Sequence, residues 1–232
     1  REDHERVDDC LEKIHVSSEH LLSLINDVLD MSKLESGHME PEHVPFDLDD
    51  LMKNVRALNE AQVAKTSIVY TYGKISFAHA KLIGSPLHLR QILLNLFSNA
   101  AKYNKENGWL RVSCNEIAFD GESGEYEFVC ADSGIGMSEE FQKRMYEPFA
   151  QEYSDPSGSA RNGAGLGLPI VKKAVEIMGG EISVVSEKNK GTTFTLDLPF
   201  EISGGTEIPH ASATDDKPLC GLNILLAEDN DL

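Results

Sequence analysis

Two glycine-rich segments, residues 132–136 and 163–168, contain the residues whose types and spacing could do chemistry. The first begins with Asp132, whose carboxylate could accept a hydrogen bond from a nucleotide base. The second leads into an apolar segment with proline in its first turn, which predicts a helix over 169–178. Such a turn leaves backbone N–H groups and the positive end of the helix dipole available to an anion. Together the two segments predict a nucleotide site, with the carboxylate at the base and the second turn at the phosphates.

A pair of asparagines offers a different kind of chemistry. Asn95 and Asn99 are four residues apart in a segment that predicts a helix, so their side chains share one face. Two carboxamide oxygens could coordinate a hard cation, and Lys102 could meet a phosphate one turn further on. The residues alone are equally compatible with amides that only cap the helix or hydrogen-bond to neighbouring backbone.

The strands that must position Asp132 follow from alternation of apolar residues. Tyr126, Phe128 and Cys130 lie two apart and therefore share one face of a strand that ends at Asp132. The other expected strands, in chain order, span residues 40–46, 67–72, 80–84, 109–119, 181–186 and 191–198.

Two helices are expected between these strands. Asp47 is an N-cap type of residue, and Ser85 followed by Pro86 marks the start of a helix through Lys102. The first of these helices is expected to turn one apolar face inward, formed by Leu51, Val55, Leu58 and Ala61.

The first 37 residues predict one long helix that ends at Gly37. Its narrow apolar seam is typical of a helix that packs against another helix, either in a partner molecule or in a hairpin. The seam consists of Leu11, Ile14, Ser18, Leu21, Ile25 and Val28, widened by Leu22 and Leu29.

Composition restricts the class of protein. The formal charge of -18 argues against nucleic acid as a partner, because a polyanion requires a basic face. The four cysteines lack the spacing of a zinc site or a disulfide framework and indicate reduced thiols in a cytoplasmic protein. No apolar stretch approaches the roughly 20 residues of a membrane-spanning helix. Whether a parent protein carries a membrane anchor is left open.

Five segments, in order, resemble the sequence boxes of the catalytic ATP-binding domain of sensor histidine kinases. That domain shares a wider family with type II topoisomerase, mismatch-repair and heat-shock chaperone ATPases. One glycine box is a weak signal, whereas five boxes in the family's order are a strong one. The matching segments are Asn95–Tyr103 (N box), Asp132–Gly136 (first glycine box), Glu147–Gln151 (F box), Gly163–Leu168 (second glycine box) and Gly191–Phe194 (last glycine box).

The resemblance implies that the first glycine box binds the base of ATP. Asp132 would accept a hydrogen bond from the exocyclic amine of adenine. Gly134 and Gly136 would let the backbone pass close to the base. Tyr103, at the end of the N box, would lie near the nucleoside.

The resemblance also implies a magnesium and phosphate site. Asn99 would bind Mg²⁺ bridging the phosphates, with Asn95 beside it. Lys102 would contact a phosphate oxygen, so that Asn95 and Lys102 are the expected catalytic residues. The phosphates would be held by the second glycine box, through Gly163, Gly165, Leu166 and Gly167.

A cover over the nucleotide is expected from residues 137–162, which include Phe149 of the F box. Thr192 and Thr193 in the last box are less specific. Strand residues that face the nucleotide and a simple β-branched pair are comparable interpretations of these two positions.

The resemblance implies an α+β fold, a two-layer α/β sandwich with a mixed sheet faced by about three helices and preceded by the long helix. Residues 1–38 are then the second helix of a dimerisation hairpin whose first helix is absent. The catalytic domain spans 39–201 and a linker spans 202–220. Residues 221–232, which end in an acidic pair, resemble the first strand of a truncated receiver domain.

None of the eight histidines fully matches the phosphorylated histidine of the family, which is followed by an acidic residue and then by Arg and Pro. His15 and His20 lack the acidic neighbour, and His4 lacks the proline. The acceptor histidine is therefore expected outside this chain.

We therefore expect a histidine kinase that transfers the γ-phosphoryl group of ATP to a histidine and then to an aspartate. The expected partners are ATP or ADP with Mg²⁺, a second copy bound through the dimerisation helices, and a receiver domain or response regulator. Two alternatives remain at this stage: a self-contained ATPase of the same superfamily, and a nucleotide-sensing binding module.

Overall fold

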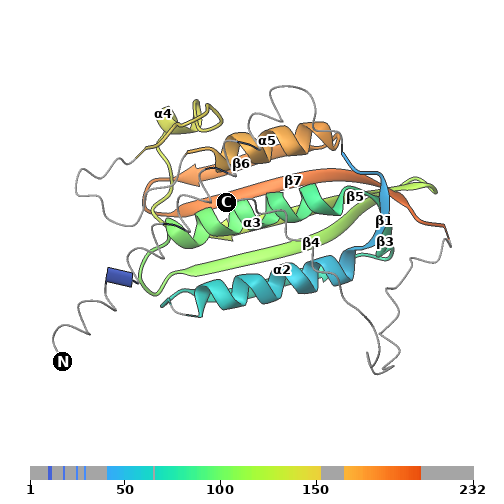
Figure 1. The fold of residues 1–232 in the computed structure, drawn as a ribbon, viewed down its shortest axis with the longest axis horizontal. Helices are drawn as coiled ribbons and strands as arrows, with labels where there is room; N and C mark the ends of the chain where they lie inside the picture. The colour runs from blue at the N-terminus through green and yellow to red at the C-terminus, as the bar shows by residue number, and fades with distance from the viewer. Residues whose placement is uncertain are drawn as a thin grey trace, which may run out of the picture.

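The computed structural model describes residues 41–64, 66–152 and 165–204, together with the single positions 10, 11, 18, 25 and 29. The main described part is a seven-stranded sheet with helices (Figure 1). Its strands are β1 (Val44–Asp47), β2 (Val69–Ser76), β3 (Lys81–Gly84), β4 (Trp109–Phe119), β5 (Ser123–Asp132), β6 (Glu181–Glu187) and β7 (Gly191–Ile202). Its helices are α2 (Leu48–Val63), α3 (Pro86–Lys102), the short α4 (Glu139–Gln142) and α5 (Gly167–Ile177).

The sheet is mixed, as expected. Its strand order is β1-β3-β7-β5-β4-β2, and β6 also pairs with β7. The pair β2–β4 is parallel, and the other described pairs are antiparallel. β7 pairs with β5 along most of its length, and this register places Thr192 opposite Asp132. The last glycine box therefore lies beside the first one.

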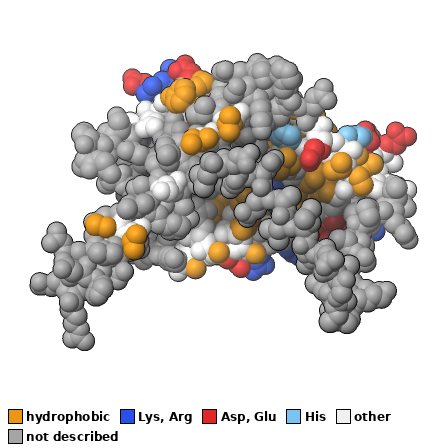
Figure 2. Space-filling model, viewed as in Figure 1, with side chains coloured by type: hydrophobic (Ala, Val, Ile, Leu, Met, Phe, Trp, Pro, Cys, Tyr) orange, Lys and Arg blue, Asp and Glu red, His pale blue; other side chains and the backbone are white. Residues whose placement is uncertain are grey.

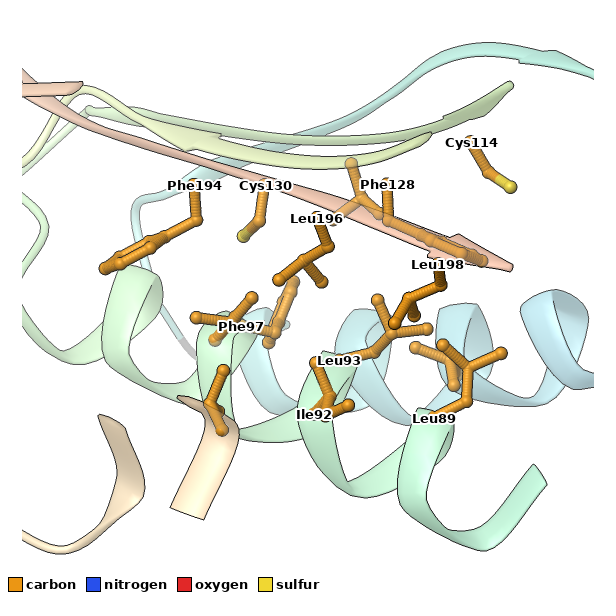
Figure 3. Close-up of a cluster of buried hydrophobic side chains, with 14 of the residues drawn as sticks. Leu89, Ile92, Leu93, Phe97, Cys114, Phe128, Cys130, Phe194, Leu196 and Leu198 are labelled. Carbon is orange, nitrogen blue, oxygen red and sulfur yellow. The ribbon is translucent and has the colours of Figure 1, made fainter. Parts of the chain in front are cut away.

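The helices α2, α3 and α5 lie side by side on one face of the sheet, which confirms the two-layer sandwich (Figure 1). Figure 3 shows how α3 contributes to the core between the layers: its apolar side chains point toward those of the sheet. The labelled side chains are Leu89, Ile92, Leu93 and Phe97 from α3, and Cys114, Phe128, Cys130, Phe194, Leu196 and Leu198 from the strands. Because α3 is held along its buried face, its C-terminal turn has a fixed place at one end of the sheet.

The start of α2 agrees with the sequence, but its buried face does not. The Asp47 carboxylate accepts hydrogen bonds from two N–H groups of the first turn, as an N-cap should. The expected apolar face is only half right, because Leu58 is 50% exposed and Ala61 is exposed as well. The residues that α2 actually buries are Leu48, Leu51, Met52, Val55, Asn59 and Val63. Asn59 replaces an apolar residue there and donates to the Tyr70 hydroxyl at 3.4 Å.

The structure describes few residues at the N-terminal end of the chain and none beyond residue 204. Of the predicted first helix only five positions are described, all helical and exposed, among them Leu11, Ile25 and Leu29. The rest of that helix, most of the predicted linker and the receiver-like strand lie outside the described residues. Within the described part, no helix is long and apolar enough to cross a membrane. Figure 2 shows small groups of basic side chains beside acidic ones on the helix-bearing face.

Candidate functional site

Asp132 lies at the end of β5 on the face that carries the helices, because it continues the alternation of three buried residues before it. One of its oxygens, Oδ1, accepts a hydrogen bond from the Gly134 N–H at 2.7 Å. Burial raises the pKa of the Asp132 carboxyl to about 6, although N–H donors from Gly134 and Thr192 and the charge of Lys105 oppose that rise. The site thus holds a partly desolvated carboxyl group that is fixed by backbone N–H groups.

The first glycine box is tightly enclosed by backbone. A Cβ atom at Gly134 would collide with the carbonyl oxygen of Tyr103, and one at Gly136 would collide with that of Glu187. Gly136 also has a positive φ of 62°, which favours glycine. Gly191 of the last box, with φ 115°, lies equally close to the carbonyl oxygen of Asp132. These glycines allow three chain segments to meet around the carboxylate.

The N box and the second glycine box are in contact. A Cβ atom at Gly167, the first residue of α5, would lie 3.6 Å from Asn99 Nδ2 and 3.7 Å from Asn95 Oδ1. Among the described residues, neither asparagine side chain has a hydrogen-bond partner, although both are partly buried. No side chain from the described part of the chain caps the N-terminus of α5. Polar groups therefore converge here without satisfying one another, which suits a bound ligand.

Lys102 lies in the last turn of α3, one turn beyond Asn99, as the sequence predicts. Its Nζ lies 5.1 Å from the ring centroid of Tyr103. Burial lowers the pKa of the Lys102 ammonium from its usual value. A half-buried cation of this kind would gain from an anion placed against it.

The F box meets the second glycine box. The Phe149 N–H donates to the Gly165 carbonyl at 3.1 Å, and both residues have a positive φ. Phe149 is 66% exposed, whereas Leu166 is fully buried, so the Leu166 side chain belongs to the interior. Gly163 and residues 153–162 of the expected cover lie outside the described residues.

The two threonines of the last box point in opposite directions. Thr192 is 8% exposed, lies on the same face as Asp132 and shares a 2.9 Å hydrogen bond with the Ser186 hydroxyl. Thr193 is its neighbour along β7 and therefore faces the other side of the sheet, in register with Ala131 and Val185. The geometry thus brings Thr192 to the candidate site and separates Thr193 from it.

Several residues that support the site were not singled out in the sequence. Gln142 donates to the carbonyls of Met137 and Ser186 at 3.1 and 3.0 Å, which attaches α4 to β6. The Glu152 carboxylate accepts from the Ser138 N–H at 3.0 and 3.3 Å. The contacts of Gln142 with Ser186 and of Glu152 with Ser138 join residues 44 and 14 positions apart, so no local spacing could have indicated them.

The donor set fits a magnesium–nucleotide complex better than a metal held by protein alone. In residues 41–64, 66–152 and 165–204, His, Cys, Asp and Glu side chains nowhere gather in the groups of three or more that could hold a metal ion. Asn99 offers one hard oxygen, and Mg²⁺ commonly combines few protein ligands with phosphate oxygens and water.

Comparisons with known proteins agree with this geometry. A family described as "Histidine kinase-, DNA gyrase B-, and HSP90-like ATPase" matches residues 84–202, just over half of the chain. The histidine-protein kinase BarA of Escherichia coli (strain K12) is 37% identical over 196 residues, which are 84% of this chain and 21% of BarA. The sensor histidine kinase GacS of Pseudomonas protegens is 34% identical, over 97% of this chain and 24% of GacS. The chain thus spans about a fifth to a quarter of these relatives.

Solved structures show the same fold. Full-length ShkA in complex with AMPPNP superposes with a TM-score of 0.69 at 31% identity, over 84% of this chain and 39% of ShkA. The catalytic domain of the histidine kinase ThkA superposes with a TM-score of 0.55 over 68% of this chain and 95% of that domain. At 24% identity the second likeness concerns the fold alone.

Proposed function

The chain belongs to the family of histidine kinase-, DNA gyrase B- and HSP90-like ATPases, and within it we propose that the chain is the ATP-binding catalytic part of a hybrid sensor histidine kinase. The parent protein would transfer the γ-phosphoryl group of ATP to a histidine outside this chain, and then to an aspartate of a receiver domain. BarA and GacS, which are named histidine kinases, support this choice because they align with most of the chain.

The observation that carries the proposal is the arrangement of two unlike groups around one end of the helix layer. Asp132 and its glycine turn, which are joined by the hydrogen bond from the Gly134 N–H, would recognise the base. Asn95 and Asn99 converge on Gly167, where α5 presents its N-terminus. A nucleotide has an uncharged base at one end and an anionic phosphate chain at the other. The base would match the first of these two elements and the phosphates the second.

In this proposal Asp132 would accept the adenine amine through the oxygen that Gly134 does not use. Gly165 and Gly167 would offer backbone N–H groups to the phosphates, and Lys102 would place its charge against them. Asn99 would hold Mg²⁺, with Asn95 beside it, and the metal would neutralise phosphate charge. The catalytic contribution of the chain would be positioning and charge neutralisation.

The chemical step itself would take place on a partner segment. The bond between the β–γ bridging oxygen and the γ-phosphorus would break as an imidazole nitrogen bonds to that phosphorus, with ADP as leaving group. A second copy would pair through the N-terminal helix, at which Leu11, Ile25 and Leu29 are exposed. A receiver aspartate would then take the phosphoryl group.

Calorimetry of ATP binding to the 232-residue chain, with and without Mg²⁺, tests the nucleotide site. We expect binding by the unmodified chain, little or none by Asp132→Ala in either condition, and loss of only the Mg²⁺-dependent part in Asn99→Ala. Absence of binding by the unmodified chain would refute the proposal.

Radiolabelled ATP tests the direction of transfer. The chain alone should remain unlabelled, whereas an added dimerisation domain that carries an acceptor histidine should become labelled in an acid-labile form. Acid-labile label on His4, His15 or His20 would contradict the expected position of the acceptor. Concentration-dependent hydrolysis of ATP without such a partner would instead favour a self-contained ATPase.

A further inference from the structure

The turn between β6 and β7, residues 187–191 and called here the hairpin turn, is part of the base end of the site. The Asn189 N–H in this turn donates to the Ile135 carbonyl at 2.7 Å. The Ile135 N–H in turn donates to the Tyr103 carbonyl at 3.0 Å. The hairpin turn, the first glycine box and the end of α3 are therefore linked in series by backbone hydrogen bonds.

Lys105 closes this series into a ring. Its Nζ donates to the Asn189 carbonyl, across 84 positions of sequence. The loop that carries Lys105 is itself fixed, because the buried Asn104 donates to the Trp109 carbonyl at 3.1 Å and accepts from the Lys105 N–H at 3.0 Å. The lysine thus extends from a fixed loop at the end of α3 to the far side of the glycine turn.

We propose that Lys105 is a positioning residue for base recognition, which holds the hairpin turn against the first glycine box and thereby keeps Asp132 aligned. The inference rests on the proposed nucleotide binding and adds a residue outside the five matching boxes. Lys105 contacts the hairpin turn and not the carboxylate, so its effect on the base is indirect.

Two features of the ring explain why the hairpin turn matters for Asp132. The backbone of Gly191, at the end of this turn, lies against the Asp132 carbonyl, and Gly136 lies against that of Glu187. Any displacement of the turn would therefore move the segments on both sides of the carboxylate. Lys105 also places a positive charge near Asp132, which lowers the pKa of that carboxyl against the effect of burial.

The test compares Lys105→Met with Lys105→Arg and with a matched control, Lys74→Met. Lys74 is exposed on β2, so the control removes the same charge elsewhere on the sheet. Calorimetric titrations use AMP, ADP and ATP with Mg²⁺ between pH 5 and pH 8. Lys105→Met should weaken the affinity for all three nucleotides by the same factor, roughly fivefold. It should also raise the pH midpoint of binding by a few tenths of a unit, because a charge that favours the ionised carboxylate is gone.

Lys105→Arg retains both a donor and the charge and should bind within about twofold of the unmodified chain, with an unchanged pH midpoint. Lys74→Met should behave as the unmodified chain. The amide hydrogen of Asn189 should exchange faster in Lys105→Met than in the control, and the melting temperatures should be similar.

Each other outcome would overturn the inference in a distinguishable way. If the unmodified chain binds no nucleotide, the proposed function and this inference both fail. If it binds and Lys105→Met matches the Lys74→Met control, only the inference fails. A loss confined to ADP and ATP would make Lys105 a phosphate ligand instead, and failure of Lys105→Met to fold would assign the lysine to stability of the domain.

Discussion

The two ends of the proposed nucleotide site are held in different ways. At the base end, strands, a glycine turn and the hairpin turn fix one another through backbone contacts, and Asp132 already accepts a hydrogen bond at 2.7 Å. At the phosphate end, Asn95 and Asn99 converge on Gly167 with no hydrogen-bond partners among the described residues. The base end is therefore organised by contacts within the chain, whereas Asn95 and Asn99 at the phosphate end have polar groups available for a ligand.

A pair of glycine substitutions tests this difference most strongly. Gly191→Ala at the base end would place a Cβ against the Asp132 carbonyl at a φ of 115°, so we expect a loss of about 3 kcal/mol or more in the free energy of unfolding. Gly167→Ala at the phosphate end makes ordinary contacts of 3.6 and 3.7 Å in the first turn of α5. Its stability should stay within about 1 kcal/mol of the unmodified chain.

Urea denaturation of both variants measures these stabilities, and calorimetry measures ATP binding by Gly167→Ala. That binding should weaken, since the new methyl group occupies space between the asparagines and the phosphates. Equal losses of stability in the two variants would show that the ends do not differ in rigidity.

Asp132→Asn should separate binding from stability at the base end. Its affinity for ATP should fall by roughly 30-fold or more, because a carboxylate acceptor for the amine is replaced by a neutral amide. Above pH 6, the variant should be more stable than the unmodified chain. The Asp132 pKa is about 6 in the folded chain against 3.8 for an ordinary aspartate, so its ionisation disfavours the folded state as the pH increases through that range.

The two pKa values define the pH range over which the two proteins should differ in stability. Below about pH 4 the carboxyl is protonated in both states, and Asp132→Asn should leave the free energy of unfolding nearly unchanged. Above pH 6 the variant should be more stable by about 1 to 3 kcal/mol, which urea denaturation at pH 4 and pH 7.5 can measure. ATP binding by the unmodified chain should weaken as the pH falls through 6. A variant that is less stable at pH 7.5 would argue against a desolvated carboxylate.

The sequence predicted the parts of the site that depend on local spacing. The alternation before Asp132 and the four-residue interval between Asn95 and Asn99 each correspond to one regular element, and both elements form as expected. The face of α2 was harder to predict, because the buried Asn59 donates to the hydroxyl of Tyr70, which belongs to another element. Partners that are distant in sequence decide such positions.

The same reason explains which site residues remained hidden. Lys105 and Asn189 are 84 positions apart, and neither belongs to a periodic pattern. Ser85 is the N-cap residue of α3 and Pro86 follows it, as expected, yet the Ser85 side chain makes no capping hydrogen bond and pairs instead with the His88 ring at 2.6 Å. In both cases a polar side chain of an unremarkable type acquires its role from tertiary contacts.

Asn99→Asp tests whether Mg²⁺ binds at residue 99 at the phosphate end. A carboxylate remains a hard ligand for Mg²⁺, so binding of ATP with Mg²⁺ should stay close to that of the unmodified chain. Without Mg²⁺, the added negative charge should repel the phosphates and weaken binding by about tenfold. Binding of adenosine should be unaffected in either condition. Equal weakening with and without Mg²⁺ in calorimetric titrations would place the metal away from Asn99.

A smaller effect is expected for Glu152. This residue directly follows the F box and is hydrogen-bonded to Ser138, which lies shortly after the first glycine box. Both of its carboxylate oxygens accept from the Ser138 N–H, and Lys188 of the hairpin turn lies 3.5 Å away as an ion pair. Glu152→Ala should lower the free energy of unfolding by about 1 kcal/mol, because the Ser138 N–H loses its acceptor. Glu152→Gln keeps an acceptor oxygen and should lower the free energy of unfolding by only a few tenths of a kcal/mol. The lost ion pair contributes little, because Lys188 is 54% exposed and solvent screens the pair.

A double-mutant cycle with Lys188→Met separates the two contributions of Glu152. If the ion pair couples the hairpin turn to Ser138, the Glu152→Gln and Lys188→Met costs should not add, and the double variant should resemble either single one. Urea denaturation of the four proteins at pH 7.5 gives the coupling energy. Fully additive costs would mean that Glu152 acts through the Ser138 N–H alone, and the hairpin turn would then belong to the base end without any electrostatic link to the segment that follows it.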